Sequence, residues 1–543
     1  MKTKSFFILI IINLCFLSNS INAQHSWQWT ITDGGKHNES INAIDYDDSG
    51  NIYLTGTFQD TSSLFGKTVI SKGREDIFIA SIKPDGSLNW LKHGGGVWED
   101  SGIDICIDHN FVYVVGFYRD QISIGDTLLN SAGTLDVLVV KYDLNGDFLW
   151  AESAGGVNED VGKSIAADDS GNVAITGDIN YIAKFGEFTV SYVKFSDMFV
   201  AKYNSEGVCQ WATSGGGSIY DSGEFVEIAN NGDVIVSGSF NDQATFDTIT
   251  VSSTEYADVF IARYSSDGAV QEVVSAGGPG NEAIQCMAID SSSNIYIAGW
   301  YMDNITIGSE KHYSSGVYDI FIAKYKPGSD FIWSKSYGGS GIDIAETMNI
   351  NAENDIYITG TFEQSVDFGL STFNSEGFED GFLSRFDTSG SLEWVYQIGG
   401  TGSLDTRDCA VDMNENLYVA GVFIDELNIG GTSFTPTGGN DLFLAKFAES
   451  TSIREEHILV INSNCYPNPF IGSIAILYTL KQKGKVSLKV YNCSGNLMRV
   501  VINEIQNTGK HVVDFNGFNL PSGIYFYILE TEEGICTRKM VKL

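Results

Sequence analysis

The chain of 543 residues has little basic charge, few prolines and few cysteines. Lys and Arg total 32 against 69 Asp and Glu, so the formal net charge is −37, and a field of this sign repels nucleic acid. Charged residues are only 19% of the chain and hydrophobic residues 43%, which excludes a disordered chain and long solvated helices. The eight cysteines show no CxxC spacing and indicate no disulfide framework, although one bridge near the C-terminus is left open.

Long apolar runs are missing except at the beginning of the chain. Residues 1–23 start with Lys2 and Lys4, continue through an apolar run to Leu17 and close on Ala23, which is the pattern of a secretory signal peptide. That run is shorter than the roughly 20 residues needed to span a bilayer, and no later stretch reaches this length. We therefore expect export and no transmembrane segment.

A repeat of 60 or 61 residues runs through most of the chain, and its landmarks occur seven times. Gly-Gly pairs begin at Gly34, Gly95, Gly155, Gly216, Gly277, Gly338 and Gly399. Tryptophans precede them at Trp29, Trp90, Trp150, Trp211, Trp333 and Trp394, with Glu272 in the remaining slot. An aspartate that opens a later strand recurs at Asp76, Asp136, Asp197, Asp258, Asp319, Asp380 and Asp441.

Each copy contains four short segments that alternate apolar and polar residues, and Asn, Asp, Ser and Gly separate them. This pattern predicts four β-strands joined by tight turns. Seven such antiparallel units without helices predict an all-β fold and a seven-bladed β-propeller over residues 24–448. A linear β-solenoid is the alternative, but its turns are shorter and its strands stack in parallel.

The two ends of the array predict how it closes. The last copy has Glu455 where a tryptophan strand is expected, and the strand around Trp29 has no unit before it. We expect the N-terminal strand to complete the seventh blade, because closure removes exposed sheet edges. The Gly-Gly pairs, the strands ending in glycine and the Asp-x-Phe-x-Ala-Lys-Tyr segments resemble the bacterial β-propeller repeat family called SBBP, over residues 27–447. That family has no common activity and implies no catalytic residues.

A different composition begins after the repeat, with a linker predicted at residues 449–462 and a further domain at 463–543. Lys and Arg outnumber acids there by nine to five, which marks a separate module. Its strands predict a small immunoglobulin-like β-sandwich. Its motif residues are Pro467, Asn468, Pro469, Gly495, Gly509, Leu520, Pro521, Gly523, Tyr525 and Lys539.

The order of these motifs resembles the type A sorting domain of the type IX secretion system of Gram-negative bacteria. The resemblance implies passage through the periplasm, recognition by the type IX machinery, and secretion or display at the outer-membrane cell surface. An ordinary immunoglobulin-like adhesion domain is the alternative.

Catalytic motifs are missing from the sequence. The seven histidines fall in unrelated phases of the repeat, and neither HExxH nor GxSxG occurs. We therefore expect no enzyme; the nearest catalytic alternative is a polysaccharide-acting enzyme that uses loop carboxylates.

Acids recur close behind the Gly-Gly pairs, four residues after the first six and slightly later in the seventh copy. They are Glu39, Asp100, Asp160, Asp221, Glu282, Asp343 and Asp405. A ring of carboxylates can bind a cation such as calcium, the one cofactor that the pattern leaves open. The alternative is turn chemistry, in which each acid accepts backbone N–H groups.

Aromatic residues outside the periodic pattern are the candidates for ligand contact: Trp98, Tyr220, Trp300 and Tyr301. The sequence thus predicts a secreted or surface-displayed scaffold whose loops bind a glycan, protein or matrix ligand. A purely structural surface-layer protein is a further alternative.

Overall fold

The structure is a computed structural model that describes residues 25–108, 110–369, 371–449, 463–480, 483–492, 497–518, 520–531 and 534–543. The predicted signal peptide and most of the predicted linker lie outside these residues. The described residues form β-strands, turns and bends, with no helix among them. The chain divides into two compact units, Met1–Glu449 and Ser450–Leu543.

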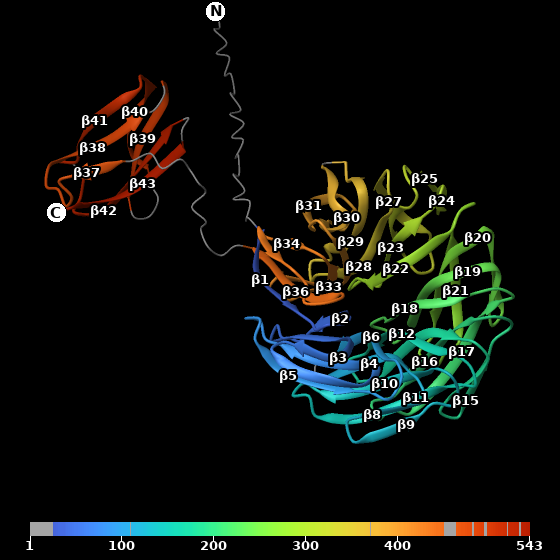
Figure 1. Cartoon of the computed structure of the whole chain (residues 1–543). Helices are drawn as coiled ribbons and strands as arrows, with labels where there is room; N and C mark the ends of the chain where they lie inside the picture. The colour runs from blue at the N-terminus through green and yellow to red at the C-terminus, as the bar shows by residue number, and fades with distance from the viewer. Residues whose placement is uncertain are drawn as a thin grey trace, which may run out of the picture. The chain divides into compact units, whose positions relative to one another are not determined.

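The strands of the first unit pair as antiparallel groups of four, numbered here in chain order (Figure 1). Group one is β2 (Glu39–Tyr46), β3 (Ile52–Leu64), β4 (Lys67–Ile82) and β5 (Leu88–Gly94). Group two is β6 (Asp100–Ile107), β7 (Phe111–Tyr118), β10 (Asp136–Asp143) and β11 (Phe148–Gly156). Group three is β12 (Asp160–Ala167), β13 (Val173–Ile179), β16 (Asp197–Tyr203) and β17 (Cys209–Gly217).

The second half of the array repeats this order. Group four is β18 (Ser222–Ile228), β19 (Val234–Phe246), β20 (Ile249–Tyr264) and β21 (Val270–Ala276). Group five is β22 (Glu282–Ile289), β23 (Ile295–Tyr301), β26 (Asp319–Tyr325) and β27 (Phe331–Gly339). Group six is β28 (Asp343–Ile350), β29 (Ile356–Asp367), β30 (Thr372–Phe386) and β31 (Leu392–Ile398). Group seven contains β32 (Ser403–Val411), β33 (Leu417–Ile424) and β36 (Asp441–Glu449).

Short hairpins project from four groups between the second and third strands. They are β8 (Gln121–Ile124) with β9 (Thr127–Asn130), β14 (Ile182–Phe185) with β15 (Phe188–Ser191), β24 (Asn304–Ile307) with β25 (Glu310–Tyr313), and β34 (Leu427–Ile429) with β35 (Thr432–Phe434). In groups one, four and six the second and third strands are longer and contain this hairpin themselves.

The fourth strand of group seven comes from the beginning of the described chain. β1 (His25–Asp33) pairs antiparallel with β36, and Trp29 lies opposite Lys446. This is the strand pairing that the unpartnered segment around Trp29 predicts. It covers the edge of β36 that would otherwise be exposed.

The first strands of neighbouring groups lie next to one another. β2, β6, β12, β18, β22, β28 and β32 contact each other in this order, and β32 also contacts β2. Side chains of one first strand also accept backbone amides of the next. The amide of Ile165 in group three donates to Asp104 Oδ2 in group two at 2.9 Å. The amide of Ile44 in group one donates to Asp408 Oδ2 in group seven at 2.7 Å.

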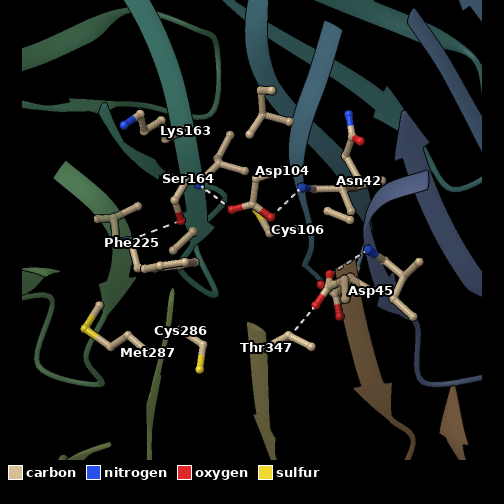
Figure 2. Close-up of a pocket in the computed structure, with 18 of the residues that line it drawn as sticks. Asn42, Asp45, Asp104, Cys106, Lys163, Ser164, Phe225, Cys286, Met287 and Thr347 are labelled. Carbon is tan, nitrogen blue, oxygen red and sulfur yellow. Dashed lines mark hydrogen bonds between the residues drawn. The ribbon is translucent and has the colours of Figure 1, made fainter. Parts of the chain in front are cut away.

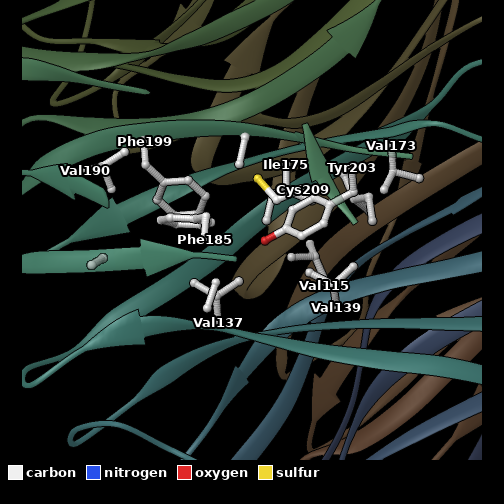
Figure 3. Close-up of a cluster of buried hydrophobic side chains, with 14 of the residues drawn as sticks. Val115, Val137, Val139, Val173, Ile175, Phe185, Val190, Phe199, Tyr203 and Cys209 are labelled. Atoms are coloured by element: carbon white, nitrogen blue, oxygen red, sulfur yellow. The ribbon is translucent and has the colours of Figure 1, made fainter. Parts of the chain in front are cut away.

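The hydrophobic core lies between adjacent groups rather than within one. Between groups two and three, Val137 and Val139 pack with Ile175 and Phe199, and all four are fully buried (Figure 3). This follows from the strand pattern, since alternate apolar residues place one apolar face of each sheet against the next.

The second compact unit contains two sheets. One is β37 (Asn464–Tyr466), β38 (Ser473–Leu480) and β41 (Gly509–Asn516). The other is β40 (Leu497–Gln506), β39 (Gly484–Asn492), β42 (Gly523–Thr531) and β43 (Gly534–Lys542). Ile476, Leu488, Tyr527 and Met540 form part of one buried cluster, so this unit has a core of its own.

Candidate functional site

The acids behind the Gly-Gly pairs bind backbone amides. Gly96 N donates to Asp100 Oδ2 at 2.6 Å, and Gly156 N donates to Asp160 Oδ2 at 2.7 Å. The same bond joins Gly35 to Glu39, Gly217 to Asp221, Gly278 to Glu282, and Gly339 to Asp343. Six of the seven predicted acids therefore hold the turn between two groups. Among the described residues, no three Asp, Glu, His or Cys side chains are placed to hold a metal ion.

The second aspartate series packs against the same turns from the preceding group. Asp76 Oδ2 accepts the amide of Lys72 at 3.0 Å, and a Cβ added to Gly95 would lie 2.1 Å from Asp76 Cγ. A Cβ on Gly96 would lie 1.8 Å from the carbonyl oxygen of Gln121. Both glycines are therefore required by close approach, which explains why the pair recurs with the aspartate.

The junction between groups six and seven departs from this pattern. Leu404, which is 2% exposed, stands where the other groups have the acid. Asp405 accepts instead from Arg407 Nε at 2.8 Å. Asp380 of group six accepts from Gln397 Nε2 at 2.6 Å and from the amide of Gly400 at 3.4 Å.

A cleft of about 510 Å³ lies at this junction. Its polar lining consists of Glu346, Glu379, Ser403, Asp405, Arg407 and Asn440. Ser403 Oγ donates to Glu379 Oε2 at 3.1 Å. Burial, with the nearby Asp405 and Glu379 carboxylates, raises the pKa of Glu346 to about 8. Phe378, next to Glu379, is 71% exposed and donates its amide to the carbonyl oxygen of Gly402 at 3.1 Å.

A second cavity, of about 620 Å³, is lined by the first strands of all seven groups. In each of these strands a register shift in the pairing leaves one extra residue, and its side chain lines the cavity. The seven bulge residues are Asn42, Ile103, Lys163, Glu224, Gln285, Glu346 and Arg407. Bulges re-aim side chains and are common beside functional sites. Glu346 and Arg407 also line the cleft, so the two cavities share a wall.

The cavity is rich in carboxyl groups. Lys163 Nζ lies 2.9 Å from both Asp178 Oδ2 and Glu224 Oε1, so its positive charge is already paired with two carboxylates. Burial raises the pKa of Asp104 to about 6 and, with repulsion from Asp104 and Asp45, that of Glu227 to about 8. Figure 2 shows Asp104 and Ser164, from neighbouring strands, on the wall. The arrangement suits a polar ligand that donates hydrogen bonds.

The aromatic candidates from the sequence divide into exposed and buried residues. Trp98 is 38% exposed beneath the Arg74 guanidinium, and Tyr220 is 59% exposed. Trp300 stacks on Tyr318 with ring centroids 4.4 Å apart. The prediction for Tyr301 is wrong, because its ring is fully buried and its hydroxyl bonds to Ser336 Oγ at 2.6 Å.

The sequence interpretation missed Phe378 and the bulge residues. The bulge residues were detectable in principle, because each falls at the same phase of the repeat and yet differs in kind from copy to copy.

The described cysteines are all free thiols: Cys106, Cys209, Cys286, Cys409, Cys465 and Cys536.

The sorting-motif residues join the ends of the second unit. Asn468 Nδ2 donates to the carbonyl oxygen of Lys539 at 2.8 Å, and the amide of Val541 donates back to Asn468 Oδ1 at 2.8 Å. The Tyr525 hydroxyl donates to the carbonyl oxygen of Pro521 at 2.8 Å. Pro467, Pro469 and Leu520 lie in bends, and Gly509 and Gly523 begin strands. Gly495 lies outside the described residues.

Comparison with known proteins identifies the domain family of this second unit. Residues 464–543 match the family described as secretion system C-terminal sorting domain. A type IX sorting domain of this kind directs its chain to the cell surface or into the medium and engages the secretion machinery. The described part of the chain contains no helix with the length and apolar character needed to span a bilayer.

Two curated proteins are similar to parts of the chain. It is 23% identical, over 79% of its length, to an uncharacterized WD repeat-containing protein of Acanthamoeba polyphaga mimivirus. It is 25% identical, over 56% of its length, to the regulatory protein FlaEY of Caulobacter vibrioides. The chain spans only 38% and 34% of the lengths of these two relatives.

Among solved structures, the chain is similar to PorZ, a surface component of the type IX secretion system of Porphyromonas gingivalis. The match has 12% identity and a TM-score of 0.31, and it covers 93% of this chain and 81% of that one.

Proposed function

We propose that the protein is an exported β-propeller of seven blades, one for each four-stranded group, which binds a glycan in the cleft between blades six and seven. Support for the propeller comes from the seven consecutive antiparallel groups, the pairing of β1 with β36 and the contact of β32 with β2. Support for export comes from the sorting domain over residues 464–543.

The observation that carries the binding proposal is the break in the repeat at this one junction. Replacement of the junction acid by Leu404 turns Asp405 toward Arg407, and the cleft opens there. Its lining supplies planar hydrogen-bonding groups, and Phe378, the chain neighbour of the lining residue Glu379, has an exposed ring. Carboxylate, amide and guanidinium groups suit sugar hydroxyls, while an aromatic face suits the apolar face of a sugar ring.

Hydrolysis of the bound glycan is the second candidate function. Glu346, Glu379 and Asp405 share the cleft, and the raised pKa of Glu346 keeps it protonated near neutral pH, as a general acid requires. A pair of carboxyl groups is enough for a glycosidase.

The test is a glycan array probed with the full chain, with and without calcium, followed by titration of the best ligand. Phe378→Ala should weaken binding by about tenfold, the upper range for loss of an aromatic contact. Tyr256→Ala is the matched control, because Tyr256 occupies the equivalent position two residues before Asp258 and is 57% exposed.

Equal binding by both variants would place the ligand elsewhere and contradict the proposal. Release of reducing ends in the same mixtures, abolished by Glu346→Gln, would establish hydrolysis instead of binding alone. A chain that captures no glycan on the array would favour the structural surface-layer alternative.

A further inference from the structure

Six of the group junctions contain two acids, one from each neighbouring group. The pairs are Asp76 with Asp100, Asp136 with Asp160, Asp197 with Asp221, Asp258 with Glu282, Asp319 with Asp343, and Asp441 with Glu39. None of these twelve side chains is more than 4% exposed. Two carboxylates in one buried site repel each other and lose hydration, so both cannot remain charged without compensation.

Every pair also has a carboxyl oxygen without a hydrogen-bond donor. The unpartnered buried atoms are Asp76 Oδ1, Asp136 Oδ1, Asp197 Oδ1, Asp258 Oδ1, Glu282 Oε1, Asp343 Oδ1 and Asp441 Oδ1. The other oxygens take backbone amides, as Asp258 Oδ2 does from Thr254 at 3.2 Å, or a hydroxyl, as Glu39 Oε1 does from Ser62. A buried acceptor without a donor is costly, and every pair has at least one such acceptor.

The seventh junction provides an internal comparison. Asp380 has Leu404 opposite it instead of an acid, and there Gln397 and Gly400 donate to its two oxygens. Both oxygens of Asp380 therefore have partners. The missing donor thus accompanies the second carboxyl group and is not a general property of the turn.

Charged groups around the pairs offer little compensation. Lys72 lies near Asp76, and His37 lies near Glu39. Arg119 donates its amide to Asp100 Oδ1 and pairs its guanidinium with Glu99. Other charged neighbours are acids: Glu99 at Asp100, Asp242 at Asp221, Asp303 at Glu282, Glu363 at Asp343 and Asp33 at Asp441. The titratable hydroxyls of Tyr118 and Tyr301 face Asp136 and Asp319.

We infer that each of the six pairs binds one proton in the folded chain, in a pH range where exposed carboxyl groups are ionised, and that its O–H supplies the missing donor. In the pair Asp258 and Glu282 each acid has one unpartnered oxygen, so a single O–H between them would satisfy both. A metal ion is disfavoured, because each junction offers only two acids and one oxygen of each pair already takes a backbone amide.

The protonation state follows from burial. Burial raises the pKa of Asp343 to about 8 and that of Asp100 to about 7, with repulsion from Asp319 and Asp76 adding to the effect. The unfolded acids titrate near 4. The folded chain therefore holds more protons between these values, and its stability falls as the pH rises toward 8. The junctions between groups would then loosen together in alkaline medium.

The experiment is thermal unfolding of the full chain between pH 5.5 and 8.5, with and without calcium, for the wild type and Glu282→Gln. The side-chain amide that this substitution introduces would donate to Asp258 permanently, so the midpoint of the variant should fall less between pH 5.5 and 8.5 than that of the wild type. Its pH dependence should correspond to one proton fewer taken up on folding. Asp343→Asn provides the same test at a second junction if Glu282→Gln does not fold.

Asp380→Asn is the matched control and should lower the midpoint equally at all pH values. Infrared spectra at pH 7 should show a protonated-carboxyl band that weakens in Glu282→Gln and not in Asp380→Asn. An unchanged pH slope and an unchanged band in both junction variants would overturn the inference. So would calcium at millimolar concentration that removes the pH dependence of the wild type, because the pairs would then hold a metal ion.

Discussion

The indole nitrogen of Trp29 donates to the carbonyl oxygen of Pro84 at 3.1 Å. The bond joins the last strand of group seven to the turn between the third and fourth strands of group one. The same bond recurs from Trp90 to Leu144, Trp150 to Ser205, Trp211 to Ser266, and Trp333 to Thr388. Trp394 Nε1 is buried and has no partner among the described residues.

This difference gives a prediction about stability. Trp90→Phe removes a bond of 2.9 Å together with part of the ring, whereas Trp394→Phe removes only part of the ring. We expect Trp90→Phe to lower the free energy of unfolding by about 1 kcal/mol more than Trp394→Phe, which is the usual net value of a hydrogen bond. Denaturant titration of the two variants measures it, and equal losses would contradict it.

The repeat landmarks predicted the strands well because they arise from local requirements of the turns. The Gly-Gly pairs follow from close contact with Asp76 and its equivalents, and every copy meets the same requirement. The burial of Tyr301 could have been predicted from its position in the same repeat. Two residues after the strand glycine, the other groups have Phe58, Tyr118, Ile179, Phe240, Phe362 and Phe423, all buried.

The cleft could not be predicted in the same way. The sequence shows that Asp405 lies one position late, but it does not show that Arg407 donates to it or that residues of groups six and seven line one cleft. The cleft depends on how groups six and seven meet. Residues that satisfy the repeat were therefore predictable, while residues that depart from it needed the three-dimensional arrangement.

The pairing of β1 with β36 predicts the effect of removing the first strand. Deletion of residues 24–33 should lower the thermal midpoint by several degrees and broaden the transition, because β36 becomes an exposed edge and Trp29 no longer reaches Pro84. Calorimetry measures both quantities. An unchanged transition would show that group seven is stable without β1.

The burial of Glu227, which lines the cavity between the first strands, predicts that removing its charge stabilises the fold in a pH-dependent way. Burial raises its pKa to about 8, so the folded chain holds this proton and loses stability as the pH rises through 8. Glu227→Gln should therefore raise the midpoint at pH 9 and change it little at pH 5. Glu255→Gln, at an exposed position, is the control and should have no effect at either pH. A gain of the same size at pH 5 would indicate better packing instead of a removed charge.

The C-terminal unit predicts that export and folding of the repeat array are separable. Residues 464–543 match a secretion system sorting domain, and the second unit has its own core of residues such as Leu488 and Tyr527. In a host with type IX secretion, a chain without residues 463–543 should accumulate, folded, in the periplasm. A reporter with a signal peptide and residues 463–543 should reach the outside. Cell fractionation with protease protection distinguishes the compartments, and thermal unfolding of the retained protein checks its fold. Truncated chain found at the cell surface would contradict the sorting role and favour an adhesion domain, because export would then depend on the repeat array itself.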